Sequence, residues 1–530
     1  MTTVHREREA KFEGAGRFDP RILRRLTAVA HVREEEPEEL DAVYYDTTDL
    51  RLLTHGVTLR RRSGGHDAGW HIKLPANGSS RTEVHAPLNA GRAGTVPGEL
   101  LRRTAAYARG AELAPVAHMR THRRRYLLLD KRKRCLAEVA QDAVAAQTLD
   151  PQGHETPGEP GGGRTRITQW SEVEVELVDG GPDLLDAAAR CLESAGWHRS
   201  PSAHKLDHAL ADELAATGGS AGRTEKADAL PSGSAGEAVM NRLRQQLDEL
   251  LAVDPGVRAD QHEAVHRMRS AARRSRNLLR GQRRLLDRSR TDPVADELRW
   301  LIHLLAAARD HEVIAERLAA QAEALRQKDP ALRPALKGLA KRVRKQERAR
   351  HDAAWRTASE QLDGARYFAL LDALDGLLAD PPLRGRAGKS AAKQLRKTAE
   401  RDGRRLRKRL VAAEHTPEGA ERAKALHSVR KAARRARHTA ETARPYTGKR
   451  ARVLRKRTKA VQQLLGEHQD AVVARKELLF LAAEEARRPG ADTFGHGLLY
   501  AAQTDTARAA RERLPRVGRK AAKPRLTRLT

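Results

Sequence analysis

The C-terminal part of the sequence contains a long internal repeat. The segment Val265–Arg280 (VHRMRSAARRSRNLLR) matches Leu426–Glu441 (LHSVRKAARRARHTAE) 161 positions later. Further along, Leu304–Leu318 (LLAAARDHEVIAERL) matches Leu464–Leu478 (LLGEHQDAVVARKEL) at an offset of 160 positions. Two matched pairs at nearly one offset indicate the duplication of one structural unit. Any fold of this region must therefore hold the same unit twice.

The apolar pattern of the repeat region is typical of packed helices. From about Ala238, apolar residues recur at i, i+3, i+4 and i+7 with Arg and Lys between them, as in Val239–Val253 and Glu297–Ala320. We therefore expect an all-α bundle of duplicated origin over residues 238–515. A basic tail without regular structure is expected to follow, over residues 516–530.

The first 210 residues follow a different period. Short alternating segments such as GVTLRRRS, GWHIKLP and WSEVEVELV are separated by Gly, Pro and Asp turns, which predicts β-strands. The segment Thr217–Glu237 is rich in Gly, Ser and Ala and has little periodicity, as flexible linkers do. The prediction is an α+β chain with a β domain over residues 1–210, a flexible linker over 211–237 and the helical domain.

Net charge differs sharply between the two parts. The 530 residues include 101 Lys and Arg against 70 Asp and Glu, for a formal net charge of +31. Residues 1–210 hold 31 basic and 30 acidic residues, whereas residues 211–530 hold 70 and 40. Such a basic half favours a polyanion partner, for example nucleic acid, polyphosphate or an anionic membrane surface.

Other sequence features favour a cytoplasmic protein without membrane association. The two cysteines, Cys135 and Cys191, lack CxxC or Cys/His spacing and cannot form a disulfide framework. The first residues, MTTVHREREAKFE, carry charges where a signal peptide needs an apolar core. No run approaches the ~18 apolar residues of a membrane span.

Charged residues gather on one face of several predicted strands. Residues two apart in a strand share a face, so Glu7, Glu9 and Lys11 of an ExExK motif point the same way. The same alternation recurs in Arg60 and Arg62, in Arg81 and Glu83, in Glu138 and Asp142, and in Glu172, Glu174 and Glu176. Strands with one ionised and one apolar face suggest a barrel with a charged lumen. A solvated, charged sheet face is the alternative.

The residue types of this lumen suit phosphate chemistry. Carboxylates are the ligands that hard cations such as Mg²⁺ and Mn²⁺ prefer. Arg binds phosphate oxygens through a planar fork, and Lys binds them as a point charge. A metal ion combined with basic clamps is the machinery of phosphoryl transfer.

The N-terminal motifs resemble the CYTH domain of the triphosphate tunnel metalloenzyme family. The resemblance rests on ExExK, YYDTTDLRLLTHGVTLRRR (Tyr44–Arg62), WHIKLP, the strand Glu172–Glu176 and SAHKLDHAL (Ser202–Leu210), and covers residues 3–210. It implies a closed antiparallel β-tunnel that binds triphosphate and hydrolyses it with Mg²⁺ or Mn²⁺.

The resemblance also implies roles for individual residues. The catalytic motif is Glu7, Glu9 and Lys11; the implied metal ligands are Glu7, Glu9, Asp142, Glu172 and Glu174; the implied phosphate-binding residues are Lys11, Arg60, Arg62, Lys73 and Arg120. The family often has a basic-x-basic pair on a later strand, which aligns with His118 and Arg120. The crowded stretch Arg120–Arg125 also allows an alignment shifted by a pair of residues. A histidine is only partly charged at neutral pH, so His118 would be a pH-dependent clamp.

The repeated helix carries a row of basic residues. His266, Arg269, Arg273, Arg276 and Arg280 are spaced 3, 4, 3 and 4 and share one helix face, as do His427, Arg430, Arg434 and Arg437 in the second copy. Acids are nearly absent from both helices, and like charges at i, i+4 are destabilising. We therefore expect these faces to meet an anion rather than solvent alone.

The order HxxR…RR…R, followed by AARDHEV or GEHQDAV, resembles the CHAD domain, a duplicated α-helical bundle. The resemblance covers residues from about 238 to 515 and implies binding of inorganic polyphosphate. It implies a basic surface or pore lined by His266, Arg269, Arg273, Arg274, His427, Arg430, Arg434 and Arg435. The matching residues Asp310 and Asp470 are expected to orient the arginines.

Two classes of function fit these patterns. The first is an enzyme that hydrolyses inorganic triphosphate, or an organic one such as thiamine triphosphate, joined to a helical domain that binds polyphosphate. The second is a non-enzymatic polyanion-binding protein of RNA, DNA or polyphosphate granules. The helical part has only eight aromatic residues, with none inside the Arg repeats. Because nucleic-acid modules usually add aromatic stacking, this scarcity favours polyphosphate, and with it a location at polyphosphate granules.

Overall fold

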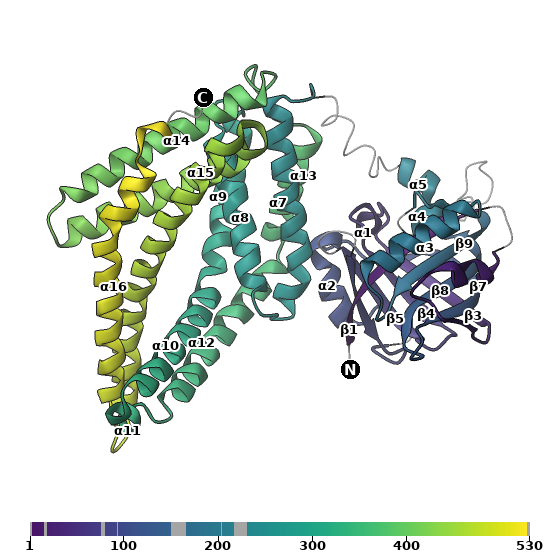
Figure 1. Cartoon of the computed structure of the whole chain (residues 1–530), viewed down its shortest axis with the longest axis horizontal. Coiled ribbons are helices and arrows are strands. Elements are labelled where there is room, and N and C mark those ends of the chain that lie inside the picture. The colour runs from purple at the N-terminus through teal and green to yellow at the C-terminus, as the bar shows by residue number, and fades with distance from the viewer. Residues whose placement is uncertain are drawn as a thin grey trace. The chain divides into compact units, whose positions relative to one another are not determined.

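The computed structural model describes residues 3–14, 18–75, 80–92, 94–149, 166–202, 204–216 and 230–526. The chain divides into two compact units, Met1–Arg223 and Thr224–Thr530 (Figure 1). Residues 217–229 of the predicted linker lie outside the described residues, and residues 211–216 and 235–237 of it are helical. No described helix is both long and apolar enough to cross a membrane.

The first unit is built on a single antiparallel sheet. Its described strands are β1 (Thr3–Glu13), β2 (His31–Glu34), β3 (Glu38–Asp46), β4 (Thr58–Ser63), β5 (Gly69–Pro75), β6 (Ser80–Ala86), β7 (Ala114–Leu129), β8 (Cys135–Thr148), β9 (Ile167–Leu177) and β10 (His198–Arg199). The strand order is β10-β1-β6-β5-β4-β3-β7-β8-β9, with β2 paired to β7. The predicted antiparallel β domain is confirmed.

Strand β1 joins the two ends of this order. Residues 3–8 pair with β6, and residues 9–13 pair with β9. The sheet therefore curves round an interior. No stretch of β1 pairs with both of these neighbours, so the predicted barrel is accurate only in a loose sense.

Short helices accompany the sheet. They are η1 (Pro20–Arg25), α1 (Arg51–Thr54), α2 (Gly98–Ala108), α3 (Pro182–Ser194), α4 (Lys205–Ala209) and α5 (Ala211–Ala216). Val173 and Val175 of β9 pack with Leu192 of α3 in one apolar core. Because alternate strand residues face opposite ways, Glu172, Glu174 and Glu176, which alternate with these valines, point to the interior of the sheet.

The second unit is entirely helical, as predicted. Its described helices are α7 (Ala235–Arg258), α8 (Ala264–Gly281), α9 (Arg288–Leu304), α10 (Ala306–Lys328), α11 (Arg333–Leu336), α12 (Leu339–Leu362), α13 (Ala365–Ala379), α14 (Ala391–Glu414), α15 (Ala420–Ala486) and α16 (Phe494–Ala521). Helix α15 is interrupted at Gly448, where φ is 66°, so it comprises two helices.

The duplication is visible in the order of the helices. Helix α8 corresponds to the part of α15 before Gly448, and α10 corresponds to the part after it. Leu318 of α10 and Leu339 of α12 pack against Leu478 of α15 and Leu499 of α16 in one core. This core joins the two copies into a single body.

The predicted basic tail is wrong in its first residues. Helix α16 continues to Ala521, past the predicted tail start at residue 516. Leu514 and Ala521 are buried in a core with Leu410 of α14, and this packing keeps the segment helical despite its basic residues.

Candidate functional site

The interior of the curved sheet holds a polar cavity. Its lining comes from strands β1, β3, β4, β5, β6, β7 and β9, from the turn between β4 and β5, and from the start of α4. The lining residues are the cations Lys11, Arg60, Arg62, Lys73, Arg123 and Lys205, the acids Glu9, Asp67, Glu83, Glu174 and Glu176, and Tyr44, Thr58 and His204. Apart from Glu7 and Arg120, the predicted catalytic and phosphate-binding residues all line this one cavity.

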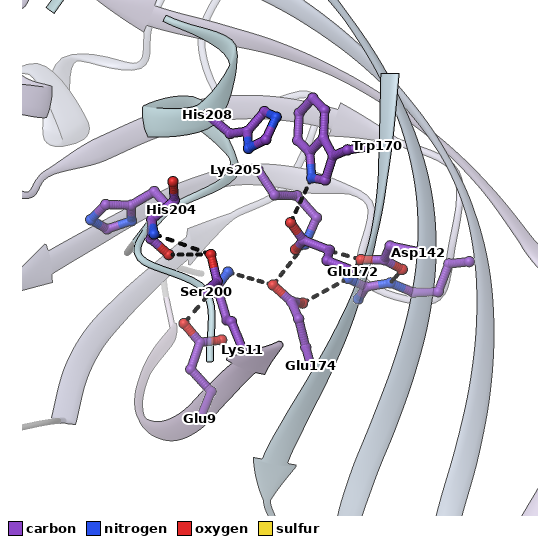
Figure 2. Close-up of polar contacts among 12 residues, drawn as sticks. Glu9, Lys11, Asp142, Trp170, Glu172, Glu174, Ser200, His204, Lys205 and His208 are labelled. Carbon is purple, nitrogen blue, oxygen red and sulfur yellow. Dashed lines mark hydrogen bonds and ion pairs between the residues drawn. The ribbon is translucent and has the colours of Figure 1, made fainter. Parts of the chain in front are cut away.

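Three carboxylates converge beside the cavity. Oxygens of Asp142, Glu172 and Glu174 lie within 4.8 Å of one another. The Nζ atom of Lys205 lies 3.0 Å from Asp142, 2.5 Å from Glu172 and 2.6 Å from Glu174 (Figure 2). Arg123 donates two hydrogen bonds to Asp142, at 2.8 and 2.6 Å, and one to Glu174 at 3.0 Å. Lys11 also forms an ion pair with Glu174, so three cations of the protein face this trio.

The charges of this cluster hold one another in the ionised state. Burial alone would raise the pKa of Glu174, but Lys11, Lys205 and Arg123 hold it well below its usual range. Burial alone would lower the pKa of Lys205, but the same carboxylates hold it well above its usual range. A metal ion at Asp142 and Glu172 would have to displace the Lys205 ammonium.

Two other carboxylates, those of Glu9 and Glu176, fit a metal ion better. Glu9 of β1 lies opposite Glu176 of β9 in the strand register. Burial raises the pKa of Glu176 to about 7, opposed by Lys73 and assisted by the carboxylates of Glu9 and Glu174. Excess negative charge among oxygen ligands suits a hard divalent cation. Glu9 and Glu176 thus fit the metal that the family implies better than Glu174, which contacts Lys11, Lys205 and Arg123.

Basic side chains accumulate on β4 at the same cavity. Arg60 donates a hydrogen bond of 3.3 Å to the Tyr44 hydroxyl, and Arg62 forms an ion pair with Asp67. Burial, together with Arg60 and Arg123 nearby, lowers the pKa of Arg62 to about 10. Positive charge that is only partly neutralised in a buried site favours the binding of an anion.

The remaining predicted residues of this unit lie elsewhere. Arg120 is 77% exposed and lies 3.5 Å from Asp41, which also contacts Nε2 of His118 at 2.9 Å. Arg123 is an odd number of positions further along β7, so it points into the cavity while Arg120 points away. Glu7 is in β1 opposite Arg81, and the side chains of both lie outside the described residues.

Arg123, Lys205 and Glu176 are the site residues that the sequence interpretation missed. Arg123 lies in the basic stretch for which a shifted alignment was open. Lys205 lies within the SAHKLDHAL motif, and Glu176 continues the acidic alternation of Glu172 and Glu174. All three residues lie in motifs that are visible in the sequence, but the sequence does not show which residues they contact in the folded protein.

In the helical unit, the duplication brings arginines of both copies together. Arg269 and Arg273 of α8 lie near Arg430 and Arg434 of α15, and we call these four residues the central arginine cluster. Burial and the other three arginines lower the pKa of Arg273 to about 9. Burial, Arg430 and Arg269 lower that of Arg434 to about 10.

Two aspartates accompany the central arginine cluster. Asp310 lies 3.0 Å from Nη1 of Arg269. Burial raises the pKa of Asp470, although Arg430 and Arg317 oppose the shift. Positive charge therefore remains in excess at the cluster.

The other predicted polyphosphate-binding residues are not in the central arginine cluster. Burial and neighbouring cations lower the pKa of both His266 and His427, which favours their neutral forms. Nε of Arg435 lies 3.0 Å from Asp402, which is 1% exposed. Arg274 lines a separate cavity with Glu441.

Comparison with known proteins identifies both units. The CYTH domain model matches residues 5–209, and the CHAD domain model matches residues 241–479. An uncharacterized protein of Mycobacterium tuberculosis (strain CDC 1551 / Oshkosh) is 37% identical over 527 residues, which cover 97% of this chain and 96% of that protein.

Solved structures resemble single units. PptA from Streptomyces chartreusis is 24% identical, with a TM-score of 0.43, over 54% of this chain and 99% of that chain. The CHAD domain from the plant Ricinus communis is 26% identical, with a TM-score of 0.40, over 53% of this chain and 93% of that chain. From the two family matches and the relative of nearly equal length, the chain belongs to the family of proteins in which a CYTH domain is followed by a CHAD domain.

Proposed function

We propose that the CYTH domain is a metal-dependent phosphohydrolase that cleaves inorganic triphosphate or a related phosphate chain. The observation that carries this proposal is the composition of the cavity, in which six Lys or Arg side chains face five carboxylates. The Lys and Arg side chains are donors suited to phosphate oxygens, and the carboxylates are ligands suited to a metal ion that would accompany the triphosphate.

The cavity residues divide between two tasks in this proposal. Arg60, Arg62 and Lys73 bind phosphate oxygens, and Arg123 of β7 adds a guanidinium beside Asp142 and Glu174. Glu9 and Glu176 would hold Mg²⁺ or Mn²⁺, which supplies Lewis-acid neutralisation of phosphate charge. Lys205 keeps Glu174 ionised and fixed in place. Water attack on the terminal phosphorus would release phosphate and the shortened chain.

Phosphate release tests the proposal. We expect release from tripolyphosphate with Mg²⁺ or Mn²⁺ and none with chelator; ATP and thiamine triphosphate as parallel substrates report whether the tunnel takes an organic triphosphate. No release from any of the three by folded protein would contradict the proposal.

A matched pair of variants tests the site. Arg123→Gln is expected to lower kcat/KM for tripolyphosphate by about tenfold or more, since a charge-assisted contact is lost. Arg120→Gln, on the exposed face of the same strand, is expected to leave it unchanged. Equal loss in both variants would contradict the assignment of Arg123.

We further propose that the CHAD domain binds inorganic polyphosphate at the central arginine cluster. The mutual lowering of arginine pKa values supports this proposal, because an anion there would relieve the repulsion. Replacement of all four arginines by Glu is expected to abolish polyphosphate binding by the full chain, with the exposed Arg356→Glu as control. Tighter binding of RNA than of polyphosphate at equal phosphate concentration would favour the nucleic-acid alternative.

A further inference from the structure

A second cavity of the helical unit is acidic in an otherwise basic domain. It lies between the α7–α8 turn, α10 and α12. The lining includes four acids, two arginines and three histidines: Asp260, Glu312, Glu316, Glu347, Arg344, Arg348, His262, His311 and His351. Histidine and carboxylate side chains together in a cavity are the donor types of a transition-metal site.

Three donor groups converge at one end of this cavity. Atoms of Asp260, His351 and Asp352 lie within 4.8 Å of one another. His351 is 4% exposed, so its ring has a fixed place. A second trio includes His262, which is 71% exposed, and its two acids are already paired with Arg309. The first trio is the better candidate.

The hydrogen bonds of His351 prepare it to bind a cation. Nδ1 lies 3.0 Å from the carbonyl oxygen of Ala308, which can only accept, so Nδ1 carries the hydrogen. Nε2 lies 2.8 Å from Oδ1 of Asp260, which is also an acceptor when ionised. At this distance a proton lies between the two atoms, and a metal ion that replaced it would move them apart to about 3.3 Å. A backbone carbonyl that holds the far nitrogen of the ring is the usual support of a metal-ligating histidine.

We propose that Asp260, His351 and Asp352 bind one divalent transition-metal cation of the Zn²⁺ class. One nitrogen and two carboxylate donors suit such an ion better than Mg²⁺ or Ca²⁺. Neighbouring donors of a tetrahedral zinc site lie about 3.3 Å apart, given bonds of about 2.0–2.1 Å, so rotation of the side chains can close the trio. A water molecule would complete the coordination.

One cation of the protein competes for this position. Arg348 pairs with Asp260 and lies 2.7 Å from Asp352, but its side chain is 62% exposed. It can therefore leave the carboxylates for solvent when an ion binds. The bound ion would cross-link the turn before α8 to α12, and α8 carries Arg269 and Arg273 of the central arginine cluster.

Zn²⁺ competition against a chromophoric chelator tests the proposal on the full chain after metal removal. We expect the wild-type protein to bind one Zn²⁺ equivalent that is lost in His351→Gln. The exposed His303→Gln on α9 is the matched control and should keep this equivalent. Glu176→Gln, in the CYTH cavity, should also keep it, which separates this site from the tunnel.

A surface variant guards against misfolding. Asp352 is 40% exposed, so Asp352→Asn should fold normally and bind Zn²⁺ about tenfold or more weakly. Wild-type binding in both His351→Gln and Asp352→Asn would overturn the proposal. The proposal would also be overturned if Glu176→Gln bound no Zn²⁺. The contact of His351 with Asp260 would then be an ion pair with a proton between the two side chains.

Discussion

At the scale of single residues, Lys205 is a buried cation that contacts three carboxylates at once and so reduces the repulsion among them. Lys205→Met would leave Asp142, Glu172 and Glu174 facing one another with Arg123 as the main counter-charge. Removing one partner of a buried ion cluster costs about 3–5 kcal/mol, so we expect a loss of that size in the free energy of unfolding. Urea denaturation measures it.

The control for this prediction is Lys131→Met, in the exposed turn between β7 and β8. A loss below about 1 kcal/mol in Lys205→Met, equal to that of an exposed pair, would contradict a structural role for the ammonium.

Glu176 makes stability depend on pH. Its pKa is about 7 in the folded protein, above the ordinary value of 4.5. The protonated form therefore stabilises the fold fully below pH 4.5, and this contribution of about 2–3 kcal/mol is lost as the pH rises through 7. Glu176→Gln cannot ionise, so its stability relative to the wild type should increase from pH 5 to pH 8.

Urea unfolding with chelator at both pH values checks this prediction. The exposed Glu112→Gln, before β7, serves as control and should show the same difference from wild type at both pH values. A constant difference for Glu176→Gln as well would show that the carboxyl ionises normally.

The strand period predicts local faces but not register. Glu9, Lys11, Arg60 and Arg62 were placed together because residues two apart share a face, and all four line the cavity. Arg123 required a further fact, its register opposite Asp142, which depends on the pairing of β7 with β8. In a run of adjacent arginines, charge alone does not reveal which of them faces inward.

At the scale of elements, α8 and the first part of α15 carry like charges against each other. Arg273→Gln removes a guanidinium whose pKa is lowered to about 9 by burial and by its neighbours. We expect the free energy of unfolding to rise by about 1–2 kcal/mol while polyphosphate binding weakens about tenfold. A gain in stability together with a loss of polyphosphate affinity would indicate that Arg273 serves binding rather than stability.

Thermal unfolding and polyphosphate titration of the full chain measure the two effects. Arg356→Gln, exposed on α12, should change neither. If Arg273→Gln were less stable than the wild type, the charge of Arg273 would already be compensated by other groups of the protein.

The repeat predicted two equivalent helix sets, and the structure has them. It did not predict that Gly448 interrupts α15 or that α16 reaches Ala521. The end of α16 is fixed by Leu410, more than a hundred residues earlier in the chain. Contacts at such a separation leave no periodic signal in the local sequence.

At the scale of the whole molecule, the excess basic charge and the charges of the CYTH cavity lie in different domains. The affinity of the full chain for polyphosphate is expected to fall linearly in a plot of log K against log salt concentration. The double variant Arg269→Gln/Arg430→Gln should reduce the slope by about 1–2, because two phosphate contacts are lost.

The same double variant should hydrolyse tripolyphosphate as the wild type does at saturating substrate. A fall in kcat together with the change in salt slope would contradict separate tasks for the two domains.

The divided pairing of β1 has a consequence for biosynthesis. The first residues of this strand find their partner in β6, but the half that bears Glu9 and Lys11 must wait for β9. Closing so long a loop is slow, and the ribosome makes β1 long before Ile167–Leu177 exists. A nascent chain that stops before β9 therefore carries the ExExK motif without a cavity around it, and the CYTH domain completes this cavity only when its first strand is joined by one of its last.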